Sequence, residues 1–260
     1  MGRPNGLLLG LDLSFNPFSL RQSYKAIAHL PLIQRVLEMR KQDVREKILS
    51  EGVANPNYYA LNFVKRYDRM FVSGDPPCYD PPLDQSIMAR AERLFVTPEE
   101  IVYDLLLEKE GRNILFLPIG NYAEGNIDAV YAMLSDNNIV YGVGDGGAHY
   151  GVICDAGYPT YMLTYWARDR KLLKMQQVVK ALCRDTALAV GLEDRGLIAP
   201  GYKADMNIID YGRLHLHAPR PVFDLPGNGR RLQQAADGYV ATIVRLKYTY
   251  SHYTGGPIFR

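Results

Sequence analysis

Cysteine is scarce in this chain, and its spacing argues against two kinds of site. The 260 residues contain three cysteines, Cys78, Cys154 and Cys183, and no C-x-x-C pair. An odd number of widely spaced cysteines argues against a disulfide framework and against a thiolate zinc site. We therefore expect a reducing, cytoplasmic location, and we predict no catalytic nucleophile among the three.

Net charge is also small, which excludes the usual signature of a nucleic-acid-binding protein. The formal charge is +2, from 30 Lys and Arg against 28 Asp and Glu, whereas nucleic-acid binders usually carry a clustered basic face. With 47% hydrophobic and 22% charged residues, the composition is ordinary for a globular protein. The expected partner is a small molecule, with no nucleic acid.

Long hydrophobic runs are missing as well. The apolar run Leu7–Leu11 is interrupted by Asp12, so it is much shorter than the roughly 20 residues that span a bilayer. It also lacks the features of an export signal, and we expect no membrane partner. An uninterrupted apolar run of this length is typical of a parallel strand that is buried on both faces.

Helix and strand signals alternate from residue 19 to residue 190, which predicts an α/β protein. The clearest signal is Thr97-Pro98-Glu99-Glu100, a capping box with proline at the first helical position. Helices and strands in close succession indicate parallel α/β units with short loops. Predicted helices include 43–52, 98–111, 127–134, 172–190 and one whose inward face is Leu32, Ile33, Val36 and Leu37; predicted strands are 114–117 and the residues leading to Asp145.

A long irregular segment interrupts this pattern. Residues 55–82 are rich in Asn, Pro, Gly and Tyr, which predicts a loop. Long loops are often lids or binding loops, and the tyrosines of this loop have two possible roles. Tyr58, Tyr59 and Tyr79 either wall a substrate pocket or pack as support beneath a surface crossover.

The sequence changes character after Gly191. The remaining segments are short strands, 206–209 and 239–246, separated by Gly and Pro and without helical periodicity. We place a boundary near Gly196, which predicts domains of residues 1–196 and 197–260.

The stretch from Ile139 to His149 contains the strongest candidate for chemistry. Its β-branched and aromatic start predicts a short buried strand, which ends in a glycine-rich turn holding Asp145. In parallel α/β proteins the functional groups lie where strands end and loops begin. An acid placed directly after a strand is therefore expected to point into the site.

Three interpretations of this turn stay open from the residues alone. Asp145 can cap a neighbouring amide, because Asp and Gly are common turn formers. Gly142, Gly144 and Gly147 match the dinucleotide fingerprint, but residues 150–159 contain too much Gly and Pro to supply the helix that the fingerprint needs. The third interpretation is an acid–base carboxylate of a metal-assisted hydrolase.

Several separated motifs, in order, resemble the amidohydrolase superfamily (amidohydrolase family 3) and, within it, the N-acyl-D-amino-acid deacylase or D-aminoacylase-like branch. The likeness covers nearly the whole chain and is more specific than any one motif. The resembling segments are Asp145-Gly-Gly-Ala-His149, Cys154-Asp155-Ala156, Pro159-Thr160, Trp166-Ala-Arg168-Asp169-Arg170, and residues 191–210, 224–232 and 238–242.

The resemblance implies both a fold and a reaction. Residues 1–196 would be the C-terminal part of a metal-dependent (β/α)8 TIM barrel, and residues 197–260 part of a small β-sandwich. The implied activity is zinc-dependent hydrolysis of a linear amide C–N bond in an N-acyl-D-amino acid. Asp145 would be the catalytic acid–base residue and a metal ligand, while Gly146, Gly147 and His149 would bind substrate.

Two further motifs carry less weight. His215-Leu-His217 puts two imidazoles on one face of a strand, but it follows the predicted barrel, and nothing nearby in the sequence supplies further ligands. We therefore predict that it does not bind metal. Arg168 and Arg170 are candidates for a substrate carboxylate, although a solvated helix start is the commoner role for such arginines.

The chain departs from the family in what precedes residue 3. The resemblance places the family's H-x-H, its bridging cysteine or lysine and two more histidines before this point, and eight βα units need about 250 residues. Two hypotheses follow. The chain is the C-terminal portion of a zinc amidohydrolase that needs a missing N-terminal half, or it is an inactive remnant or interaction domain that associates with itself or with a partner.

Overall fold

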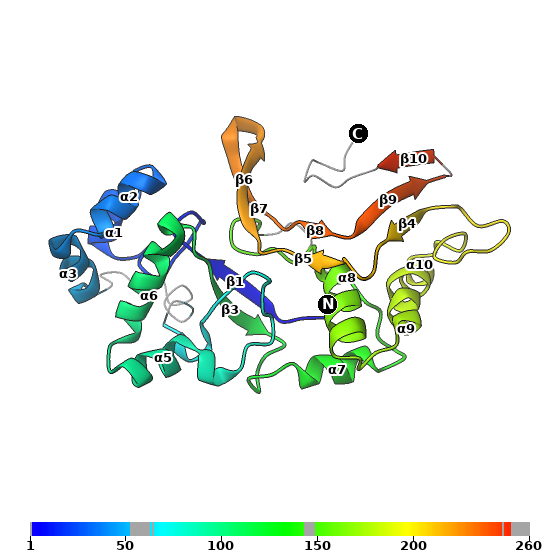
Figure 1. Cartoon of the computed structure of the whole chain (residues 1–260), viewed down its shortest axis with the longest axis horizontal. Helices are drawn as coiled ribbons and strands as arrows, with labels where there is room; N and C mark the ends of the chain where they lie inside the picture. Colours follow the sequence, from blue (N-terminus) through cyan, green and yellow to red (C-terminus); the bar gives the residue numbers. More distant parts are fainter. Residues whose placement is uncertain (1, 53–62, 64, 143–148, 246, 251–260) are drawn as a thin grey trace.

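The computed structural model describes residues 2–52, 63, 65–142, 149–245 and 247–250. Helices and short strands are mixed along the chain. Figure 1 shows helices gathered at both ends of an elongated molecule, a small sheet between them, and the C-terminal strands along one side. Within the described ranges, no helix has the length and apolarity needed to cross a bilayer.

The central sheet has the order β1-β3-β2, and both of its pairings are antiparallel. The prediction of a parallel strand at Leu7–Leu11 is therefore wrong in direction, although the strand itself is present. Neighbouring residues of the sheet belong to two different core clusters: Leu8 packs into one and Leu9 into the other. Both faces of β1 are therefore buried, which explains its apolar run. A strand can be buried on both faces whether its neighbours run parallel or antiparallel to it. The strands are β1 (Asn5–Leu9), β2 (Phe71–Val72) and β3 (Leu115–Gly120).

One group of helices covers the face of the sheet to which Leu9 belongs. The capping box predicted at Thr97 is confirmed, and its helix buries Val102, Tyr103 and Leu106. The helix predicted around Val36 is also confirmed, but Ile33 and Leu37, expected inside, are 61% and 56% exposed. These helices are α1 (Gln22–Ile27), α2 (Leu32–Met39), α3 (Gln42–Ser50), α5 (Ile87–Leu94) and α6 (Pro98–Leu107).

A second group of helices packs against the other core cluster, around Trp166. The helix predicted at 127–134 is confirmed, and the one predicted at 172–190 is present over residues 175–189 as three consecutive segments. These helices are α7 (Asp128–Leu134), α8 (Tyr158–Tyr161), the π-helix η4 (Met162–Asp169), α9 (Met175–Lys180) and the π-helix η5 (Ala181–Asp185), and α10 (Thr186–Ala189) continues η5.

The C-terminal part consists of short antiparallel strands, as its sequence predicts. The described strands of the whole chain form four sheets of two or three strands each, so the barrel and the sandwich stay predictions from the resemblance, as does the boundary at Gly196. The C-terminal strands are β4 (Met206–Ile209), β5 (His215–Leu216), β6 (Arg220–Leu225), β7 (Gly229–Gln233), β8 (Ala236–Asp237), β9 (Tyr239–Val244) and β10 (Lys247–Tyr250).

The buried strand predicted before Asp145 is wrong over the part that the structure describes. Residues 139–142 have no strand assignment, and Ile139 and Val140 are 43% and 52% exposed. Tyr141 is buried, and its hydroxyl donates to the carbonyl of Leu134 at 2.7 Å. A β-branched run becomes a strand when a neighbour pairs with it, and no described strand pairs with these residues.

Candidate metal centre and the segment after Asp145

Of the four predicted site residues, the structure describes His149. Asp145, Gly146 and Gly147 lie outside the described residues, so their roles stay predictions. His149 is described and exposed, with a left-handed backbone at φ 52°. Its carbonyl accepts from the amides of Val152 and Ile153 at 2.8 and 2.9 Å. His149 is therefore the first residue of a tight turn that runs to Val152 and Ile153.

The residues after His149 are held by strands from both ends of the chain. The Leu8 amide of β1 donates to the Val152 carbonyl at 2.7 Å, and the Leu232 amide of β7 donates to the Tyr150 carbonyl at 2.9 Å. No helix begins until Tyr158 in the described residues after 148. The helix required by the dinucleotide fingerprint is thus missing from residues 149–157, as predicted.

A buried polar cluster lies just beyond this turn. Arg3 is fully buried and donates to the Cys154 carbonyl at 2.5 Å and to Asp155 at 3.3 Å. Its guanidinium also lies 3.9 Å from the centroid of the Tyr79 ring. Burial raises the pKa of the Cys154 thiol to about 11, which keeps it protonated at neutral pH and unsuited to be a nucleophile. Tyr79 is buried in the core, so it packs as structural support, the second of the two alternatives for the loop tyrosines.

The two arginines considered for a substrate carboxylate have structural partners. Arg168 lies at the end of η4, where it donates to the Leu214 carbonyl at 2.6 Å and pairs with Asp169. Arg170 lies 3.6 Å from Asp80. These arginines therefore lie at the end of a helix and not, as the sequence suggested, at its start. Arg168 also holds Leu214, the residue before His215.

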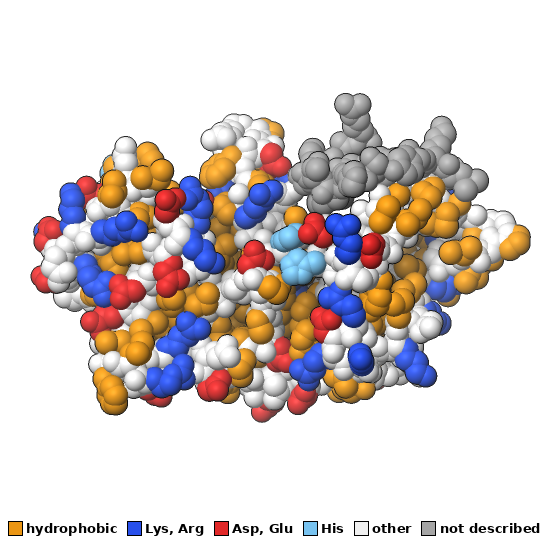
Figure 2. Space-filling view, in the orientation of Figure 1, with side chains coloured by type: hydrophobic (Ala, Val, Ile, Leu, Met, Phe, Trp, Pro, Cys, Tyr) orange, Lys and Arg blue, Asp and Glu red, His pale blue; other side chains and the backbone are white. Residues whose placement is uncertain are grey.

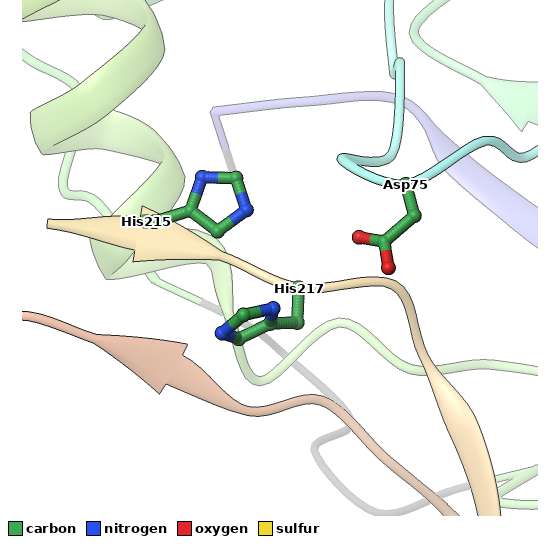
Figure 3. A group of neighbouring side chains, drawn as sticks. All are labelled: Asp75, His215 and His217. Carbon is green, nitrogen blue, oxygen red and sulfur yellow. The ribbon is translucent and has the colours of Figure 1, made fainter.

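His215 and His217 do have a third potential metal ligand near them, contrary to the sequence prediction. One ligand atom from each of Asp75, His215 and His217 lies within 4.8 Å of the other two. Figure 3 shows the side chains converging, with His215 on β5, His217 just after it, and Asp75 on a loop across from both. Histidine side chains also appear near the middle of the molecular face in Figure 2, among charged groups.

Hydrogen bonds hold this cluster in place. His217 Nε2 lies 2.8 Å from the Asp237 carboxylate, and Gln234 donates to the His217 carbonyl at 2.9 Å. The Ala218 amide donates to Asp75 at 3.1 Å. Imidazole nitrogen and carboxylate oxygen are usual zinc ligands, so the donor set fits that metal.

Sequence reasoning missed Asp75 because nothing in its neighbourhood indicates a ligand. It lies in the loop that follows β2, in the run Asp75-Pro-Pro, which predicts only a turn. The Ala218–Asp75 hydrogen bond joins residues 143 positions apart. Only the tertiary fold brings the aspartate to the histidine pair.

A comparison with known protein families identifies the class of this chain. Residues 98–245 match the sequence model of the amidohydrolase family. Because the match covers more than half of the chain, the protein belongs to the amidohydrolase family. No curated protein and no solved structure matches the chain.

Proposed function

We propose that this chain contributes to zinc-dependent hydrolysis of a linear amide C–N bond, with N-acyl-D-amino acids as the substrate class. The observation that carries the proposal is the family match, which spans residues 98–245 and so includes Asp145 and the glycines beside it. Family membership supports hydrolase activity in general. The narrower substrate class comes from the resemblance of the motifs around Asp145, Arg168 and residues 224–232 to the deacylase branch.

Asp145 is the proposed proton carrier. Water adds to the amide carbonyl, the Asp145 carboxylate accepts a proton from that water, and the same proton passes to the amide nitrogen as the C–N bond breaks. The products are a carboxylate and an amine. Zinc, when bound, would lower the pKa of its water to about 7 and polarise the carbonyl. Asp145 is also the proposed ligand of this zinc ion.

The neighbouring residues have proposed supporting roles. Gly146 and Gly147 carry no side chain, so the backbone can approach a substrate closely. His149 is exposed and begins the turn that runs to Val152 and Ile153, which is compatible with a place at the edge of a substrate site. The strands β1 and β7 hold the residues after it, and a rigid support of this kind orients catalytic loops.

Replacement of Asp145 tests this proposal. Asp145→Asn keeps the size of the side chain but cannot accept the proton, so we expect turnover of N-acetyl-D-amino acids by the complete, zinc-supplemented protein to fall at least about 100-fold. The assay follows release of the free amine, with the L-enantiomers in parallel. Activity of the variant near that of the wild type would overturn the assignment of Asp145.

A non-enzymatic interaction domain is the second candidate function. The observation that favours it is a run of exposed apolar side chains in the segment after α10: Val190, Leu192, Leu197 and Ile198, of which Val190 is 71% and Ile198 87% exposed. Apolar residues exposed in groups often mark protein–protein contacts. A complete wild-type protein that shows no amide hydrolysis with zinc, yet self-associates in light scattering, would favour this candidate over the enzyme.

A further inference from the structure

We propose that Asp75, His215 and His217 form a binding site for a divalent transition metal of the zinc class, and that this site is complete without Asp145. Two neutral imidazoles and a carboxylate supply three protein ligands, and solvent fills the remaining position. The site would tie the loop after β2 to strand β5. It goes beyond the proposed hydrolysis, which depends on Asp145.

The distances between the ligand atoms suit a small change on metal binding. Ligands of a tetrahedral zinc ion lie about 3.3 Å apart, given metal–ligand bonds of about 2.0–2.1 Å. The three ligand atoms already lie within 4.8 Å of one another. Asp75 is exposed and both histidines are half-buried, and the Ala218 amide occupies only Oδ1 of its carboxylate. A small shift of the aspartate that keeps this hydrogen bond can therefore bring its second oxygen to the metal without moving the strand.

The Asp237 carboxylate fixes the ring orientation and the tautomer of His217. It lies 2.8 Å from His217 Nε2, so the neutral imidazole donates its Nε2 proton to Asp237 and leaves the lone pair on Nδ1 free. A carboxylate behind a ligating histidine is the usual arrangement around protein-bound metals, because it fixes the tautomer and the ring orientation. Asp237 is thus a positioning residue and not a ligand.

The backbone around the two histidines is also fixed in advance. His215 pairs with Asp237 in the β5–β8 ladder, Arg168 holds the Leu214 carbonyl at 2.6 Å, and Gln234 holds the His217 carbonyl at 2.9 Å. On the other side of the site, the Ser73 amide donates to Ile114 of the segment before β3 at 2.9 Å. Little conformational freedom is lost when a preformed site of this kind binds metal.

The donor set predicts which metals bind. Imidazole ligands favour zinc, cobalt, nickel and copper, whereas magnesium and calcium prefer sites made of oxygen ligands alone. We therefore expect Zn²⁺ and Co²⁺ to bind, and Mg²⁺ and Ca²⁺ at the same concentration not to compete. The metal should also raise the melting temperature in a concentration-dependent way, since it binds the folded chain in preference to the unfolded one.

Direct metal binding by the full chain tests the proposal. We would titrate the chain with Zn²⁺ by calorimetry and record the visible absorption of the Co²⁺ form, which reports ligand type and geometry. His215→Ala and Asp75→Asn should each abolish tight binding of one Zn²⁺ and change the Co²⁺ spectrum. His29→Ala replaces an exposed histidine outside the cluster and should bind like the wild type. Asp237→Asn should weaken binding about 10- to 100-fold.

The results separate this proposal from the proposed hydrolysis. Asp145→Asn should keep the Zn²⁺ site and its effect on melting temperature, whatever happens to turnover. The proposal is overturned if the wild-type chain binds no Zn²⁺ saturably, or if His215→Ala and Asp75→Asn, shown by circular dichroism to be folded, bind Zn²⁺ as tightly as the wild type.

Discussion

Two glycines with almost the same backbone conformation have different surroundings. Gly191 has φ +76° and Gly196 has φ +77°, both in the left-handed region that side chains disfavour. A Cβ added at Gly191 would meet no atom within 4 Å. At Gly196 it would lie 2.5 Å from the Cys183 carbonyl oxygen and 2.7 Å from Arg184 Cα, both backbone atoms. Gly196 is therefore required for close approach as well as for conformation.

This pair gives a matched prediction at the scale of single residues. Gly191→Ala should lower the free energy of unfolding by about 1–2 kcal/mol, the usual cost of a left-handed residue with a side chain. Gly196→Ala should cost about 1–3 kcal/mol more, because η5 must shift to admit the methyl group. Urea denaturation of both variants measures the difference. Equal losses would show that the close contact at Gly196 contributes nothing.

At the scale of elements, helix α6 shows how a local signal sets a boundary. The Thr97 hydroxyl accepts from the Glu100 amide at 3.3 Å, and the Glu100 carboxylate accepts from the Thr97 amide at 2.8 Å. The helix that starts there buries Tyr103, whose hydroxyl donates to the Met39 carbonyl of α2 at 2.6 Å. The cap therefore positions a residue that joins two helices.

Removal of this cap should have a measurable cost. Thr97→Ala deletes the hydroxyl that satisfies the Glu100 amide, and we expect a loss of about 1 kcal/mol in the free energy of unfolding. Thr97→Ser keeps a hydroxyl at the same position and should stay within about 0.5 kcal/mol of the wild type. Thermal and urea denaturation of both variants give the comparison. A loss of the same size in the serine variant would rule out the hydroxyl as its cause.

The helix α6 and its start could be predicted from the sequence, while the pairing of the strands could not. The capping box at Thr97 and the helix end at Gly191 depend on residues within one or two turns, so local pattern is sufficient. The direction of β1 was mispredicted because burial on both faces produces the same apolar run in parallel and antiparallel sheets. The predicted strand at Ile139 failed because strand formation depends on a pairing partner that the local pattern does not reveal.

In the candidate metal centre, too, the local motif could be read from the sequence and the tertiary contacts could not. The histidine pair was visible as H-x-H, but Asp75 comes from a loop that no local pattern connects with β5. The residues near His215 and His217 in the sequence supply no further ligand, and only the fold brings one to them. Asp237, which orients His217, is likewise found only through the β5–β8 ladder. Ligands that come from separate elements depend on tertiary contacts, and those contacts are not encoded by spacing.

At the scale of the whole molecule, one hydrophobic cluster joins the two predicted domains. Trp166 on η4 is 1% exposed and packs in the same cluster as Leu214, Leu216 and Leu232, which follow the predicted boundary at Gly196. The Trp166 indole also donates to the Gly2 carbonyl at 2.6 Å. Segments from the start, the middle and the end of the chain therefore share one core.

A shared core predicts that residues 1–196 and 197–260 unfold together. Trp166 is the single tryptophan, so its fluorescence reports the junction while far-ultraviolet circular dichroism reports the whole chain. In urea the two signals should give the same midpoint, as expected for a cooperative transition. Leu214→Ala, which removes a side chain that is 1% exposed, should move both midpoints to lower urea by an amount corresponding to about 2–5 kcal/mol. Two separated transitions, with Leu214→Ala shifting one of them alone, would instead show that the two parts fold as independent domains despite the contacts around Trp166.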